Sequence, residues 1–150
     1  MTNPEKIPTV ALVLGVAGLV PFLACAAALM LSFPLPLIGA GSELRRALII
    51  YAVAILSFLG GVRWGIAMGY SDSKLVVRDL VISVVPALVG WWAALLSPRH
   101  NLWVMAVAFV ALGLLDYGLA CRTVAPEWYG RLRLALSAAV AVILGLAAFA

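Results

Sequence analysis

Apolar residues in this chain fall into five long runs, separated by short stretches rich in polar residues, glycine and proline. The runs cover residues 9–32, 47–69, 80–96, 102–120 and 134–149. Because a helix of about 20 apolar residues crosses the ~30 Å hydrocarbon layer of a bilayer, each run is long enough, or nearly so, to span it. The pattern predicts an all-α fold, an integral membrane bundle of five transmembrane helices, with residues 1–150 as a single domain.

Prolines and aromatic residues support these boundaries. Pro34 and Pro36 follow the first run, and a proline both lacks an amide donor and restricts the residue before it. Pro21 lies inside the first run and predicts a kink there. Tryptophan and tyrosine gather where the helices are expected to reach the lipid headgroups. These aromatic residues are Tyr70, Trp91, Trp92, Trp103, Trp128 and Tyr129.

Composition agrees with a lipid environment. Hydrophobic residues make up 66% of the chain and charged residues 11%, with a mean hydropathy of +1.18. A water-soluble domain carries much more polar surface. The net charge of +4 comes from basic residues beside the apolar runs, not from a patch interleaved with aromatics, so nucleic acid is not an expected partner.

The basic residues also predict an orientation. The amino end and the second and fourth connections carry six of them: Lys6, Lys74, Arg78, Arg122, Arg131 and Arg133. The opposite side carries Arg45, Arg46 and Arg99. Since cytoplasmic connections are enriched in lysine and arginine, the amino end is predicted to be cytoplasmic.

Motifs for catalysis or metal binding are missing from the sequence. Cys25 and Cys121 have no CxxC spacing, and His100 has no companions, so neither a zinc site nor a disulfide framework is predicted. There is no GxSxG, HExxH or P-loop string. We therefore expect a protein that is not an enzyme and that uses no metal or cofactor.

Small residues form a stripe on one face of the second run. Ser57, Gly61, Gly65 and Gly69 are four residues apart, which lets a neighbouring helix approach to backbone contact. Arg63 points the other way, so neighbours are expected on both faces and this helix is predicted to be central. The expected helix-packing residues are Ser57, Gly60, Gly61, Gly65, Gly69 and, in the third run, Pro86.

Two charged residues lie inside apolar runs at matching depth. Arg63 is six residues before the end of the second run and Asp116 four before the end of the fourth, and these two helices run parallel. A charge within the bilayer is costly, so pairing or hydration is expected. We predict an Arg63–Asp116 ion pair, which is either a fixed clasp between two helices or part of a polar pocket that opens to the cytoplasmic side.

The third helix, with Asp79 at its start just before the apolar run, has a polar face at helical spacing. This face is formed by Asp79, Ser83, Pro86 and Gly90. This face could line a groove beside the ion pair. Alternatively, Asp79 only favours the positive end of its helix and Pro86 only bends it. The candidate intramembrane polar site consists of Arg63, Asp116, Asp79 and Ser83.

Two functions are compatible with these features. The first is a non-enzymatic bundle that supports or assembles with a membrane-protein partner or a second copy, through the Gly61 face and the region of Arg63. The alternative is a small solute or proton transporter or channel, in which Arg63, Asp116 and Asp79 line a polar cavity. One water-accessible pocket shared by the polar side chains would favour transport, whereas pairing in a dry core would favour the structural role.

The stretch from Tyr51 to Gly65 reads Tyr-Ala-Val-Ala-Ile-Leu-Ser-Phe-Leu-Gly-Gly-Val-Arg-Trp-Gly and resembles the signature of the transmembrane-protein-69-like family. Three weaker similarities support it: Leu14-Gly15 with Gly18, Pro21 and Phe22; Ser83 to Pro86 with Trp91; and Asp116 with Trp128-Tyr129 and Leu132-Arg133. The resemblance implies a short multi-pass protein of the bacterial inner membrane or its mitochondrial descendant, with no established activity. Because no arginine-rich amphipathic presequence is present, a bacterial source is expected.

Overall fold

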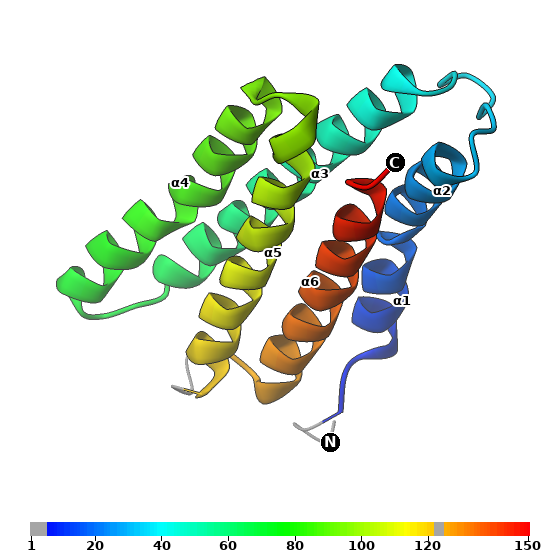
Figure 1. Cartoon of the computed structure of the whole chain (residues 1–150). Helices are drawn as coiled ribbons and strands as arrows, with labels where there is room; N and C mark the ends of the chain where they lie inside the picture. The colour runs from blue at the N-terminus through cyan, green and yellow to red at the C-terminus, as the bar shows by residue number, and fades with distance from the viewer. Residues whose placement is uncertain (1–5, 122–124) are drawn as a thin grey trace.

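The computed structural model describes residues 6–121 and 125–150, and within these residues the fold is all-α (Figure 1). The helices are α1 (Thr9–Ala17), α2 (Val20–Met30), α3 (Ser42–Ala67), α4 (Ser73–Leu95), α5 (Pro98–Cys121) and α6 (Glu127–Ala147). Five helical segments of the described chain are long and apolar enough to cross a membrane, with α1 and α2 together forming the first. The predicted fold class and number of spans are confirmed.

The first span is broken between α1 and α2. The break lies at Gly18 and Leu19, just before Pro21, which has no amide hydrogen to donate to the turn before it. The Leu19 amide instead bonds the Val16 carbonyl, at 3.0 Å, in a tighter turn. The Tyr51 hydroxyl of α3 donates to the Gly18 carbonyl at 3.0 Å, so the break is held against the next span. The predicted kink is therefore present as a short interruption.

The remaining helices pack as two antiparallel hairpins, α3 with α4 and α5 with α6 (Figure 1). α2 lies against α3 and α6, and α1 lies against α6. Between the hairpins the core is apolar: the rings of Phe22 and Phe109 meet edge to face with centroids 5.8 Å apart, among buried leucines such as Leu48 and Leu56. α3, predicted to be central, contacts α2, α4 and α5, although α5 and α6 bury a larger share of their spanning segments.

α4 and α6 begin seven residues before their apolar runs, at Ser73 and Glu127 rather than at 80 and 134. The Asp72 carboxylate caps α4 by accepting a hydrogen bond from the Lys74 amide at 2.8 Å. The added turns place Arg78 and Arg133 inside helices rather than in connections. Because Arg133 is buried, it no longer counts among the basic residues near this side of the membrane, and the comparison of the two sides becomes five against three.

α3 also begins early, at Ser42 rather than 47, and its first turns reach the opposite end of the bundle. There the Arg45 guanidinium donates to the Pro98 carbonyl at 3.0 Å and to the Ala147 carbonyl at 3.5 Å. Arg45 thus joins the start of α3 to the start of α5 and the end of α6.

Candidate functional site

A row of charged side chains of alternating sign crosses the bundle from α4 to α6. We call it the charge ladder, and its members in spatial order are Arg78, Asp79, Arg63, Asp116 and Arg133. Nη1 of Arg63 lies 3.4 Å from Oδ1 of Asp116, so the predicted ion pair is present in the structure. Nη2 of Arg63 lies 3.4 Å from Oδ1 of Asp79. Arg63 therefore bridges both acids and links α3 to α4 and α5.

At the α4 end, Asp79 has two further partners. It accepts from Nε of Arg78 at 2.9 Å and from the Tyr70 hydroxyl, in the turn between α3 and α4, at 2.7 Å. Burial and the hydrogen bond to Asp79 both raise the pKa of Tyr70, since an ionised phenol would face a carboxylate. The Arg78 side chain is 41% exposed, so this end of the ladder reaches the surface.

At the α6 end, Asp116 has the same types of partner. It accepts from Nε of Arg133 at 3.1 Å and from the Tyr129 hydroxyl at 3.5 Å. The Arg133 side chain is only 9% exposed. Its Nη2 atom is buried and has no hydrogen-bond partner among the described residues. This end of the ladder stops inside the bundle.

Four of the five ladder charges, all except Arg78, lie at the same depth in the bundle. Arg63 lies four residues before the end of α3 and Asp116 five before the end of α5, while Asp79 and Arg133 each lie six residues after the start of their helices. At 1.5 Å per residue these positions are about 6–9 Å from the helix ends. Because α3 and α5 run antiparallel to α4 and α6, all four charged residues lie near the same end of the bundle. Charges this deep are stable only when paired, as these are.

Gly60 sets the distance between α3 and α4. A Cβ at this position would overlap the Ser83 carbonyl oxygen, and Cγ of Pro86 would lie 3.8 Å from it. Gly90 has a similar role further along, where a Cβ would lie 3.4 Å from Cδ1 of Leu56. These close approaches let Arg63 reach Asp79 in the adjacent helix. Gly60 and Pro86 from the predicted packing set therefore do lie at a helix contact.

The exposed stripe on α3 does not pack within this chain. A Cβ added at Gly61 or Gly65 would meet nothing within 4 Å, and Ser57 and Gly69 are exposed. The prediction that this stripe contacts a neighbouring helix is wrong for the chain alone, because the face that meets α4 contains Gly60 instead. Contact with another chain stays a prediction.

Ser83 does not join the ladder. Although it is buried near Gly60, its hydroxyl donates to the Leu80 carbonyl of its own helix at 2.6 Å. The structure therefore brings together three of the four predicted site residues, Arg63, Asp79 and Asp116, and leaves the fourth out.

Sequence reasoning missed the roles of Arg133, Tyr70 and Tyr129, because all three lie outside the apolar runs. One signal was available for Arg133. Residues Gly130, Arg133, Ser137, Val140 and Leu144 recur every three or four positions and are all buried. That spacing is typical of one helix face and extends the fifth helix before its apolar run.

The contacts of the ladder join helices, and both of its acids already have partners. Within the described ranges no group of three or more His, Cys, Asp and Glu side chains lies close enough to hold a metal ion. Cys25 is buried and Cys121 exposed, and both are free thiols. Asp79 and Asp116 are already held by arginines on two sides. The ladder acts on the fold by binding four helices, α3 to α6, at one level.

Known proteins are similar to this chain in sequence. The family described as a protein of unknown function, DUF3429, matches residues 7–149. Transmembrane protein 69 of Xenopus tropicalis is 41% identical over 136 residues, which cover 87% of this chain and 50% of that protein. Transmembrane protein 69 of Mus musculus is 31% identical over 129 residues, 85% of this chain and 50% of that protein.

The chain spans about half the length of the curated relatives it matches. No solved structure matches it. The apolar helices and the names of these relatives agree on a multi-pass membrane protein. Since the match covers nearly the whole sequence, the chain belongs to the DUF3429 family of unknown function, and it is similar to transmembrane protein 69 of two vertebrates.

Proposed function

We propose that this multi-pass membrane protein is a non-enzymatic structural protein that assembles with other membrane proteins. The observation that carries the proposal is the state of the two acids of the charge ladder. Asp79 and Asp116 are fully buried, and each is bound by two arginines and a tyrosine. A carboxylate that carries protons or acts as a general base has to exchange protons with water or substrate. Buried acids that already have these partners support a fixed framework.

The proposed contact surface is the outer face of α3, where Ser57, Gly61 and Gly65 are exposed. In a bilayer, helices associate through close packing, and small residues let two backbones approach. The proposed partner is a transmembrane helix of another membrane protein.

Proton flux tests the framework against the transporter alternative. The full chain would be reconstituted in liposomes and a potential imposed across the membrane. We expect no proton flux above that of empty vesicles. A flux in the wild type that Asp116→Asn and Asp79→Asn both abolish would instead establish a pathway through the ladder.

The contact surface is tested with matched leucine variants. Gly61→Leu adds a side chain to the stripe, and Val81→Leu, at an exposed position of α4, is the control. The mass of the complex extracted from the native membrane would be measured by native mass spectrometry. We expect a complex with a different protein for the wild type and the control, and loss of it for Gly61→Leu. A complex of two copies, or no change in Gly61→Leu, would contradict the proposed partner.

The proposed location is the bacterial inner membrane with a cytoplasmic amino end, supported by the excess of basic residues at that end. Single cysteines at Lys74 and Arg46, in a chain without Cys25 and Cys121, would test the orientation. A membrane-impermeant maleimide should label Arg46→Cys in intact cells and Lys74→Cys only after permeabilisation. The reverse pattern would show the opposite orientation.

A further inference from the structure

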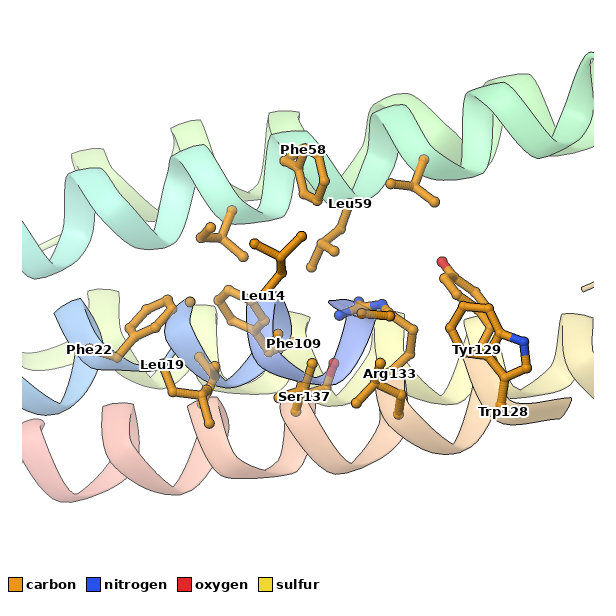
Figure 2. A pocket seen from close by; sticks show the side chains of 18 residues that line it. Leu14, Leu19, Phe22, Phe58, Leu59, Phe109, Trp128, Tyr129, Arg133 and Ser137 are labelled. Carbon is orange, nitrogen blue, oxygen red and sulfur yellow. The ribbon is translucent and has the colours of Figure 1, made fainter. Parts of the chain in front are cut away.

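A cavity of about 430 Å³ lies beside the α6 end of the charge ladder, between the first span, α3 and α6 (Figure 2). Its wall is almost entirely hydrocarbon, contributed by residues such as Leu14, Phe22, Phe58 and Phe109. Binding sites for small organic ligands measure about 300–1,000 Å³ and are mostly apolar, with few polar groups. The cavity has the size and the chemistry of such a site.

Among the polar side chains of α6 that line the cavity, Arg133 and Ser137 lie one helical turn apart. Nη2 of Arg133 and Oγ of Ser137 are buried and have no hydrogen-bond partner within the described residues. Figure 2 shows the Arg133 side chain extending from α6 on the side that faces α3. The Ser137 side chain lies at the edge of the cavity beside Gly113 of α5, where an added Cβ would be 2.9 Å from Oγ of Ser137. Buried polar groups in native proteins are almost always paired. Their place on the cavity wall indicates an occupant that carries a hydrogen-bond acceptor.

The charge of Arg133 is already compensated. Its Nε atom lies 3.1 Å from Oδ2 of Asp116. An anionic group at Nη2 would come close to this carboxylate in a medium of low dielectric constant, where like charges repel strongly. A neutral carbonyl oxygen accepts from Arg133 and Ser137 without that repulsion. The electrostatics therefore favour a neutral acceptor.

The cavity lies next to the least buried helix. No residue of α1 is buried, and α1 packs mainly on α6. Leu14 of α1 lines the cavity and is 67% exposed, so the α1 side of the cavity adjoins the surrounding lipid. A ligand that enters from the bilayer has to be lipid-soluble.

We propose that this cavity binds a lipid-soluble amphiphile, whose neutral carbonyl oxygen accepts hydrogen bonds from Arg133 and Ser137 and whose apolar part packs against Phe22 and Phe58. Two sources have this chemistry: a quinone with an apolar chain and a neutral glycerolipid ester. The proposal does not rest on the assembly role, because none of the residues changed in its test belongs to the ladder or to the α3 stripe.

The experiment uses three probes on the purified full chain in detergent. Decylubiquinone represents the quinone, dioleoylglycerol represents the glycerolipid ester, and decylbenzene is a hydrocarbon without a carbonyl. The dissociation constant follows from the saturable rise in melting temperature with probe concentration, since a ligand that binds the folded state stabilises it. Saturation by at least one carbonyl probe is expected, and the probe that saturates identifies the source. Saturation by neither carbonyl probe would overturn the proposal.

Substitutions then locate the bound probe. Ala11→Phe fills the cavity from α1 and should weaken carbonyl-probe binding by about tenfold or more, whereas Val13→Phe, on the exposed side of α1, should leave it unchanged. Ser137→Ala should weaken carbonyl-probe binding about fivefold, the effect of one hydrogen bond, and leave decylbenzene unaffected. Equal effects of the two phenylalanine variants, or equal weakening of all three probes by Ser137→Ala, would overturn the site.

Discussion

The two ends of the charge ladder contain the same groups in different surroundings. Asp79 and Asp116 each accept from Arg63, from a second arginine and from a tyrosine. The second arginine is 41% exposed at the α4 end and 9% exposed at the α6 end. If Arg78 loses its carboxylate partner, water can hydrate its guanidinium group. The guanidinium group of Arg133 is buried, so water cannot compensate for the loss of Asp116. The same chemical contact therefore has different consequences when it is broken.

The largest expected effect comes from removing a charge at the buried end. Asp116→Asn leaves Arg133 without a carboxylate, and breaking a buried pair in this way costs about 3–5 kcal/mol. Asp79→Asn should cost less, about 1–3 kcal/mol, because Arg78 can be hydrated and Arg63 keeps Asp116. The free energy of unfolding would be measured by SDS titration in mixed micelles. The two variants make the same chemical change, so equal losses would contradict the difference between the ends.

A smaller effect is expected where the α4 end depends on a close helix contact. Gly60→Ala places a methyl group against the Ser83 carbonyl and should destabilise the fold by about 1–3 kcal/mol, because the α3–α4 contact must open. Gly61→Ala is the control, since it points into open space and raises helix propensity equally. Its unfolding free energy should stay within about 0.5 kcal/mol of the wild type. Similar losses in both would show that the loss at Gly60 does not come from its contact with the Ser83 carbonyl.

The smallest effect concerns the hydroxyl at the exposed end. Tyr70→Phe removes the hydrogen bond to Asp79 and should lower the unfolding free energy by about 0.5–1.5 kcal/mol at neutral pH. Because folding raises the pKa of Tyr70, its contribution is complete below the unfolded value near pH 10 and is lost as pH rises through the folded pKa.

Unfolding measured from about pH 8 to pH 12 would test this linkage. The difference in stability between wild type and Tyr70→Phe should shrink at the alkaline end of the range. A difference that stays constant would show that the Tyr70 hydroxyl does not titrate with folding.

The spans were predictable because lipid imposes a long apolar stretch on each helix. The starts of α4 and α6 were not, since their first turns carry Lys74, Arg78, Arg131 and Arg133, and hydropathy assigns charged turns to connections. Arg133 is helical and buried because Asp116 compensates its charge, and that partner lies 17 positions away in the sequence. A pattern read along one helix contains no information about such a partner.

The ladder was predictable in part, from depth alone. Counting residues from the span ends placed Arg63 and Asp116 at one level, and they do pair. Helical spacing also identified a small-residue stripe, but Gly60 and Gly61 differ by only about 100° around the helix axis. Which of these faces meets α4 depends on tertiary packing, so the sequence alone favoured the wrong one.

The spacing of the ladder also bears on how the chain enters the bilayer during synthesis. Arg63 and Asp79 are 16 positions apart in the α3–α4 hairpin, and Asp116 and Arg133 are 17 apart in the α5–α6 hairpin. If each hairpin inserts into the bilayer as a unit, its acid and its arginine can pair during insertion. Neither hairpin then exposes an unpaired charge to lipid. Only the Arg63–Asp116 bond, which spans 53 positions, forms after both hairpins are in place.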